Sequence, residues 1–484
     1  MSRINTNVSA LQSYHRLTSN QSDLNQRLER LSSGLRINHG SDDPAGLIAS
    51  ESLRSEITGI EKAIENSSRA INVIATGEGA LAEVSKLLLE IRGLVNTSAN
   101  EGARSDDEIQ ADQLQIDSLI ESIDRISNTT TFNGKKLLNG ELAYTVSSVD
   151  SSDIQRLQLF GARVPDGSAL PVTLLVTQSA QTAQLTLRAS AGTGLLASGA
   201  LSAGNNLTIE VRGTNGTSTF TFNGGTVNSA IRNSINNSVE VTGVSASLSG
   251  NHLKFNSLQY GSDAFVSIRA LTGTFNNVPG DTGSEEDKGR DVGVNVNGQA
   301  ATGRGLQASL RTAGLDVVFD LASSFATSLN ATSTFGVTGG GAAFAIGPEI
   351  NSDAFVSLGI PSVASSRLGS ATDGFLRSLA TGGTATVVNG EFRTAERIVL
   401  AAIDQVTNLT GRLGGFQRNQ LETNINSRRI ALENVKASES AIRDADYAVE
   451  VSLLNRAQIL VQSTTLTLGI ANQTPQNVLS LLQR

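Results

Sequence analysis

Residues 31–47 read LSSGLRINHGSDDPAGL, and they interrupt two stretches that are otherwise typical of amphipathic helix. LNQRLERL precedes the interruption and LRSEITGIEKAI follows it. Glycines allow backbone angles that a helix interior does not use. An aspartate directly before a proline marks a helix start, because the carboxylate accepts free N–H groups and proline fits the first helical position. The stretch therefore predicts a joint between two helical rods, formed by Gly34, Gly40, Asp42, Asp43 and Pro44.

The same joint contains a glycine in the apolar repeat of the first rod. Gly34 lies between Leu31 and Leu35, where the repeat suggests continuing helix. In a helix interior, alanine is more favourable than glycine by about 0.5–1 kcal/mol. The sequence therefore predicts that Gly34→Ala would stiffen the end of the first rod.

Both ends of the chain carry large apolar residues at the spacing of coiled coils and long bundles. Near the C-terminus one such frame runs from Leu421 to Leu460. An ordinary bundle core would give the same spacing, but the length of the frame favours long rods. We expect the two ends to pair antiparallel and to meet other copies, because one partner helix covers only one stripe. The predicted self-assembly core comprises Leu24, Leu28, Leu31, Leu35, Ile442, Val449, Leu453 and Leu460.

The middle of the chain differs from the ends in composition. All phenylalanines except Phe416 lie between Phe132 and Phe392. This region is rich in Gly, Thr, Ser and Val, which is typical of β-strands and turns. Two hairpins are predicted, one around Asn215-Gly216 and one within 244–257. The predicted class is α+β, with long antiparallel rods from both termini and a β-rich insertion between them.

Composition argues against several functions. The chain has 484 residues, a net charge of −8 and no cysteine. An acidic chain without a basic patch is not expected to bind nucleic acid or a membrane surface. No stretch is long and apolar enough to span a membrane, and MSRINTNVSALQSYHRL has no apolar segment of signal-peptide length. We expect no disulfide, and any export to use a route without a cleaved signal.

No residue pattern predicts catalysis, a cofactor or a metal. The chain has three histidines, His15, His39 and His252, and contains neither a zinc-protease motif nor a phosphate-binding loop. His39 stands close to Asp42 and Asp43, but helix capping accounts for those aspartates. We therefore do not expect an enzyme.

The motifs at both ends resemble those of bacterial flagellin. In the N-terminal part these are INTNVSAL, LSSGLRIN with SDDPAGL, ENSSRAINVIATGEGALAEV and TTTFNGKKLLNG. In the C-terminal part they are NLTGRLGGFQRNQLETNIN, ENVKASESAIRDADYAVEVSLLNRAQILVQS and ANQTPQNVLSLL. The resemblance covers roughly 1–140 and 393–484, and residues 205–270 look like a small β module inserted in many flagellins.

The resemblance implies a subunit that self-assembles into the helical filament of the bacterial flagellum and serves motility. It implies an inner coiled-coil domain, a helical outer-tube domain that includes a β-hairpin, and a surface-exposed β-rich insertion. The joint would connect the first two domains. The expected ranges are 1–41 with 444–484, 42–145 with 341–443 and the hairpin near 344–363, and 146–340.

The resemblance also implies partners. These are further copies of the chain, the flagellar cap and hook–filament junction proteins, an export chaperone at the C-terminal helices, and a Toll-like flagellin receptor. In LLLEIRGLVN (87–96), Ile91, Arg92 and Leu94 match the receptor-binding pattern of the family, whereas Glu90 and Gln115 depart from it. Two alternatives remain open: a hook–filament junction protein of the same architecture, and a flagellin with an enzymatic insertion.

Overall fold

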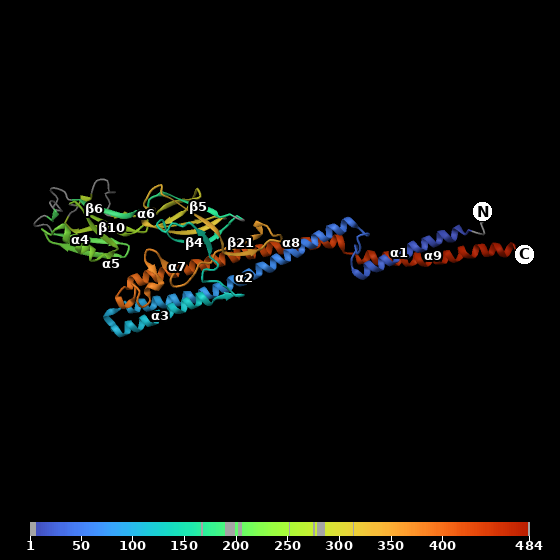
Figure 1. Ribbon diagram of the computed structural model, residues 1–484, viewed down its shortest axis with the longest axis horizontal. Helices are drawn as coiled ribbons and strands as arrows, with labels where there is room; N and C mark the ends of the chain where they lie inside the picture. The colour runs from blue at the N-terminus through green and yellow to red at the C-terminus, as the bar shows by residue number, and fades with distance from the viewer. Residues whose placement is uncertain are drawn as a thin grey trace. The chain divides into compact units, whose positions relative to one another are not determined.

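The computed structural model describes residues 6–165, 168–188, 199–201, 206–250, 252–273, 276–277, 286–312 and 314–482. Figure 1 shows helices formed by both ends of the chain and strands formed by its middle. The chain divides into two compact units. The first comprises Met1–Ile71, Ala345–Phe355 and Gln417–Arg484, and the second comprises Asn72–Phe344 and Val356–Phe416.

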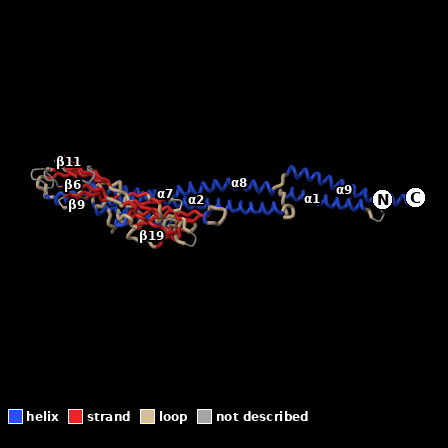
Figure 2. Tube along the Cα trace, turned by 90° about the horizontal axis from the view of Figure 1, so that it is seen from above, coloured by secondary structure: helices blue, strands red, loops and turns tan. Residues whose placement is uncertain are grey.

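The first unit is built from paired helices. Helix α1 (Val8–Ser33) lies beside α9 (Tyr447–Leu482), and both chain ends lie at the same end of this pair in both views (Figures 1 and 2). The first half of α2 (Pro44–Ser98) is linked to α8 (Thr423–Arg443) by ion pairs. These pairs join Lys436 to Glu61 and Arg443 to Glu51, each at 2.7 Å. A π-helical turn, Gln417–Glu422, precedes α8.

The structure corrects the prediction of one uninterrupted rod from Leu421 to Leu460. Helix α8 ends at Arg443, because Asp444 adopts an extended conformation with φ −77° and ψ 147°. Helix α9 then begins at Tyr447. The Asp446 carboxylate starts it by accepting the N–H groups of Ala448 and Val449 at 2.9 and 3.2 Å. Local capping therefore divides a segment whose apolar repeat continues without a break.

The helices of the second unit confirm the apolar rows predicted from spacing. The unit contains the rest of α2, α3 (Asp106–Thr129) and α7 (Phe392–Phe416). A capping box between Ser105 and Glu108 starts α3. The apolar residues that recur at helical spacing are buried, and they include Ile74, Leu81, Leu88, Val95, Ile109, Ile116, Ile123, Val399, Val406 and Leu413.

The strands of the second unit form two double-layered bodies. In the first, the sheets β15-β14-β5-β19-β3 and β16-β17-β18-β4 share one apolar core around Val172, Phe319 and Phe335. In the second, the sheets β12-β6-β10-β9 and β13-β11-β7-β8 share a core around Leu185 and Phe255. Helix α4 (Asn228–Asn236) contributes Ile231 and Ile235 to that second core. The predicted α+β class, with helical ends and a β-rich middle, is confirmed.

The longer strands are numbered in the order in which they occur along the chain. They are β3 (Tyr144–Ser147), β4 (Ile154–Ala162), β5 (Leu170–Gln178), β6 (Thr182–Arg188), β7 (Leu207–Gly213), β8 (Gly216–Phe222), β9 (Val244–Ser249), β10 (His252–Tyr260), β11 (Phe265–Thr272), β14 (Gly293–Val296), β17 (Gln307–Arg311), β18 (Leu315–Leu321), β19 (Thr332–Gly340), β20 (Ala342–Ala345) and β21 (Phe355–Leu358). Shorter strands are β1 (Thr131–Phe132), β2 (Lys135–Lys136), β12 (Asn276–Asn277), β13 (Glu286–Lys288), β15 (Gln299–Ala300), β16 (Thr302–Arg304), β22 (Gly369–Ser370) and β23 (Gly374–Phe375). Two short α-helices, α5 (Val239–Thr242) and α6 (Ser323–Ala326), also lie among the described residues of this unit.

Both predicted hairpins are present, and one turn differs in position. Strands β7 and β8 pair so that Gly213 faces Gly216, which leaves Thr214 and Asn215 in the turn instead of Asn215 and Gly216. Strands β9 and β10 pair antiparallel within the second predicted hairpin. None of the helices in the described residues combines the length and apolar character that a membrane crossing requires.

Candidate functional site

The joint begins α2 as the aspartate–proline pair predicts. Pro44 is the first residue of α2, and the Asp43 carboxylate accepts the N–H of Gly46 at 2.9 Å. A side chain at position 46 would meet this carboxylate, because a Cβ built there lies 2.4 Å from Asp43 Oδ2. The capping role predicted for Asp43 is therefore confirmed, and Gly46 makes room for it.

Gly34 ends α1, and the expected effect of alanine at this position is wrong. Its backbone is left-handed, with φ +75°, and its N–H donates to the carbonyl of Arg30 at 2.9 Å. A residue with a Cβ is strained in this conformation even where space is free. No atom lies within 4 Å of a Cβ built at Gly34. The apolar repeat suggested helix interior, but the glycine is a helix stop.

Hydrogen bonds tie this joint to the connection between α8 and α9. Leu35 and Asp444 form an isolated antiparallel bridge. The Arg36 N–H donates to the carbonyl of Arg443 at 2.7 Å, and the Ala445 N–H donates to the carbonyl of Gly34 at 2.9 Å. The Arg36 guanidinium donates to the Ile442 carbonyl at 2.6 and 3.1 Å. The two breaks in the helices are therefore held together, and neither is a free linker.

Asp42 organises the loop within the joint. Its carboxylate accepts the N–H groups of Asn38 and His39 at 3.1 and 3.0 Å, and the side chain of Gln26 at 2.9 Å. The hydrogen bond from the His39 backbone, followed by those from Asn38 and Gln26, lowers the pKa of Asp42 below its ordinary value. The ionised carboxylate is thus the form that holds the loop.

The residues predicted as a self-assembly core fall into two groups. One group is half-buried: Leu24, Leu31, Leu35, Ile442 and Leu453. Leu28, Val449 and Leu460 lie on exposed surface, with 47%, 52% and 38% of their areas accessible. These three side chains are therefore available to a second molecule.

A further apolar stripe on α9 was not predicted. Ile459, Leu466 and Ile470 are 65%, 70% and 68% exposed. Their separations of seven and four residues place them on one side of the helix. At 3.6 residues per turn, that side lies opposite Ala457 and Thr464, which face α1. The spacing of these residues indicates the stripe, but it was missed because only the apolar frame from Leu421 to Leu460 was followed through this segment.

The contact between α1 and α9 includes small and polar residues beside its half-buried leucines. Ser13 and Ala457 are buried in it. Asn7 Nδ2 donates to the Ala471 carbonyl at 2.8 Å, and Asn20 Nδ2 lies 3.4 Å from Thr464 Oγ1. The pair therefore has polar contacts beside its half-buried leucines and leaves further apolar side chains on its outside, so an isolated pair exposes apolar surface to water.

The helix region compared with the receptor-binding pattern is partly buried. Glu90 and Gln115, where the chain departs from that pattern, are exposed. Ile91 is completely buried, and Leu94 is half-buried. Arg92 lies 3.7 Å from Glu396 of α7.

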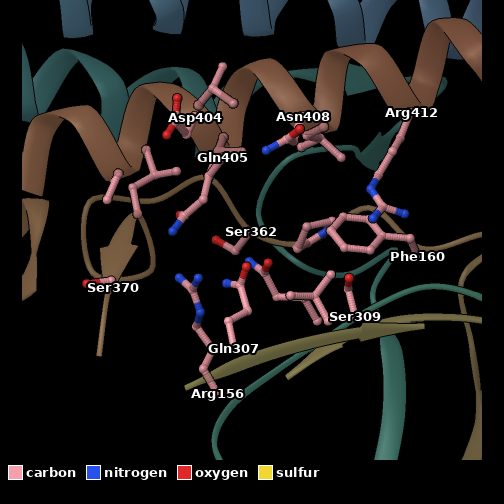
Figure 3. Close-up of a pocket in the computed structure, with 18 of the residues that line it drawn as sticks. Arg156, Phe160, Gln307, Ser309, Ser362, Ser370, Asp404, Gln405, Asn408 and Arg412 are labelled. Carbon is pink, nitrogen blue, oxygen red and sulfur yellow. The ribbon is translucent and has the colours of Figure 1, made fainter. Parts of the chain in front are cut away.

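A polar cavity of about 380 Å³ lies where α7 meets the sheet that contains β4, β17 and β18 (Figure 3). Arg412 reaches from α7 over the ring of Phe160, with its guanidinium carbon 3.9 Å from the ring centre, and pairs with Asp316. Arg156 pairs with Asp320 at 2.8 Å and donates to the Gly369 carbonyl at 2.6 Å. Arg412 and Arg156 therefore serve to fasten the sheet to its surroundings.

His39 is the histidine that stands close to Asp42 and Asp43 in the sequence. Its Nε2 lies 2.7 Å from Glu29 Oε1. Within the described part of the chain, no three His, Cys, Asp or Glu side chains gather in a way that could hold a metal ion.

Comparisons with known proteins agree at both ends of the chain. Residues 4–143 match the bacterial flagellin N-terminal helical region, and residues 397–482 match the bacterial flagellin C-terminal helical region. Flagellin of Bacillus subtilis is 48% identical over 139 residues, which cover 28% of this chain and 46% of that protein. Flagellin of Salmonella muenchen is 28% identical over 533 residues, covering 99% of each chain.

Among solved structures, the chain is similar to flagellar hook associated protein-3 from Legionella pneumophila. That match has 13% identity and a TM-score of 0.31, and it covers 81% of this chain and 98% of the other. The sequence similarity to flagellins reaches both ends and extends through the middle. The chain therefore belongs to the bacterial flagellin family and is a structural subunit of the flagellar filament.

Proposed function

We propose that this subunit joins the filament through the outward apolar faces of α1 and α9. The observation that carries the proposal is the exposed stripe of Ile459, Leu466 and Ile470 on α9. On α1, Val8, Leu11 and other apolar residues are also exposed. Burying such side chains stabilises an assembly by about 1.5–3 kcal/mol for each fully buried residue. Neighbouring copies supply the burial.

Seeded polymerisation tests this proposal. Leu466→Gln keeps a good helix former but makes the centre of the stripe polar, and Leu466→Met keeps it apolar. Purified subunits are mixed with short filament seeds, and the polymer is measured by sedimentation. We expect little polymer from Leu466→Gln and wild-type yield from Leu466→Met. Equal yields from the Gln variant and the wild type would contradict the proposal.

The domain organisation belongs to the same proposal. Residues 1–41 with 444–484 form the inner domain, 42–145 with 341–443 the outer-tube domain, and 146–340 the insertion exposed on the filament. The bridge between Leu35 and Asp444 supports a boundary at both positions. Gly34, Gly40, Asp42, Asp43 and Pro44 then connect the first two domains.

We further propose how the subunit travels and which proteins it meets. It reaches the extracellular filament by flagellar export without a cleaved signal peptide, and an export chaperone binds its C-terminal helices. Cap and hook–filament junction proteins contact it at the two ends of the filament. The exposed positions Glu90 and Gln115 weaken recognition by a Toll-like flagellin receptor, and a reporter-cell assay comparing the wild type with Glu90→Arg tests this.

The insertion has no enzymatic role in this proposal. Two arginines that line the polar cavity are engaged, Arg412 by Asp316 and Arg156 by Asp320 and the Gly369 carbonyl, as a structural fastening requires. Purified filaments incubated with broad protease and glycosidase substrates should give background rates. Turnover that disappears on deletion of 146–340 would contradict this part of the proposal.

A further inference from the structure

We propose that Glu450, together with Arg27 and Arg30, fixes the register in which α1 and α9 pair. The inference rests on the proposed function, in which this pair forms the inner part of the subunit. Arg27 Nη1 donates to both Glu450 oxygens, at 3.1 and 3.2 Å, and Arg30 Nη1 donates to Oε1 at 3.4 Å. The Glu450 side chain is only 8% exposed, and the two arginines are 19% and 15% exposed.

The apolar residues along this contact do not select one register. On α1 the half-buried positions Leu17, Leu24 and Leu31 recur every seven residues. On α9 the half-buried positions Val461 and Leu468 recur with the same period. A slip by one heptad therefore brings apolar residues to apolar residues again.

The charged residues are not repeated in this way. A slip by seven residues would place Glu450 at the level of Asn20 or of Gly34 instead of Arg27. A buried carboxylate without its cations is strongly unfavourable, whereas the correctly paired group contributes little net stability. The ion group therefore acts mainly against wrong pairings, as single buried polar residues do in coiled coils.

Other polar groups around Glu450 are consistent with the same register. Asp23 lies 3.2 Å from Arg27 Nε on the same helix, so it stays with Arg27 in any register. The contacts of Asn20 with Thr464 and of Asn7 with Ala471 cross the helix pair in the observed register. These contacts, like the backbone bridge between Leu35 and Asp444 at the end of the pair, involve uncharged groups, so losing them costs less than stranding a buried charge.

Distance measurement between spin labels tests the register directly. The chain has no cysteine, so Ser9→Cys and Thr467→Cys give two unique label sites on exposed positions. A small fraction of labelled subunits is polymerised with unlabelled wild type, so that each distance lies within one subunit. Labelled subunits in which Glu450 is intact should give one distance between the two labels. The matched control Leu24→Met should give the same distance.

The informative variant combines Arg27→Met, Arg30→Leu and Glu450→Leu. We expect it to enter filaments and to show a second population displaced along the helix axis by about 10 Å, the length of one heptad. A single unchanged distance would overturn the inference. If this variant does not enter filaments, a triple variant is measured instead: Arg27→Gln, Arg30→Gln and Glu450→Gln. A second, displaced population would again support the inference, and a single unchanged distance would overturn it. Failure of the Leu466 polymerisation test would contradict the filament contact while leaving this distance result interpretable.

Discussion

Asp43 is a residue whose role follows from its immediate neighbours. Asp43→Ala removes the acceptor for the Gly46 N–H, and loss of an N-cap costs about 1 kcal/mol. We expect a reduced free energy of unfolding in denaturant titration and a lower yield of filament. Asp43→Asn keeps an acceptor and is the control. Unfolding curves that coincide for the wild type and Asp43→Ala would contradict the capping role.

Gly34 is a residue whose role follows from its backbone angle. Since its φ is +75°, Gly34→Ala should destabilise the end of α1 by about 1–2 kcal/mol. Gly34→Asn should cost less, because asparagine tolerates the left-handed region. Thermal melting of filaments is followed by circular dichroism. The melting temperature should be highest for the wild type, lower for Gly34→Asn and lowest for Gly34→Ala. A melting temperature for Gly34→Ala at or above the wild-type value would refute the helix-stop interpretation.

Asp42 makes the joint sensitive to acid. Its pKa is lower in the folded protein than in the unfolded chain. Its stabilising effect is therefore fully present above the unfolded pKa, near 3.9, and is lost as the pH falls through the folded pKa. Hydrogen exchange of the Asn38 and His39 amides should accelerate over this interval beyond its intrinsic pH dependence. Asp42→Asn should abolish that extra acceleration, and an identical profile in the variant would rule Asp42 out as the cause.

At this scale, the sequence revealed only contacts between near neighbours. The cap at Asp43 was predictable because Asp, Pro and Gly46 lie within one turn. The break near Gly34 was predictable from the glycines of the joint, but the left-handed backbone of Gly34 was not, since spacing alone contains no dihedral angle. The pairing of Arg27 with Glu450 joins residues separated by 423 positions, and no local pattern reports that contact.

Among the elements, α1 and α9 are expected to be the least stable in a free subunit. Their shared contact includes polar groups such as Asn20 and Thr464, and apolar side chains such as Leu466 remain exposed. Limited proteolysis of monomers should remove roughly 1–45 and 445–484 before the rest is cleaved. The same segments should resist cleavage in filaments, where neighbouring copies cover them. Equal protection in monomer and filament would contradict this expectation.

The predictability of elements depended on which force sets their limits. The buried rows of α2, α3 and α7 followed from spacing, because one face of each helix packs on a core. The break between Arg443 and Tyr447 did not, because capping by Asp446 overrides a continuing apolar repeat. The β7–β8 turn was placed one residue too late, since pairing of Gly213 with Gly216 sets its position.

For the whole molecule, the insertion should be dispensable for polymerisation. Its first and last strands pair at Tyr144 and Gly340, so removing 146–340 leaves two chain ends that already lie together. The apolar stripe of α9 lies outside the deletion, so we expect the variant to polymerise. Its filaments should be thinner by electron microscopy, because the insertion is missing. Loss of polymerisation in a deletion variant that is still exported and folded would show that the insertion makes required contacts.

A smaller deletion provides an internal control. Gln181 and Arg290 are joined by an antiparallel bridge at the entrance of the second β body. Removing 182–288 and closing the gap with a short glycine-containing turn keeps the first β body. Filaments of intermediate diameter are expected. Diameters that do not follow the order of the two deletions would place the insertion away from the filament surface.

The pairing of α1 with α9 links the folding of the two helices to the order in which they are synthesised. Helix α1 is synthesised well before its partner, since Glu450 of α9 follows Arg27 of α1 by 423 positions. Chain synthesis proceeds from the N-terminus at roughly 5–20 residues per second, so α1 remains without its partner until α9 has also been made. A chain that is truncated before α9 cannot form the pair. The contact between α1 and α9 therefore forms only after the whole β-rich middle of the chain has been synthesised.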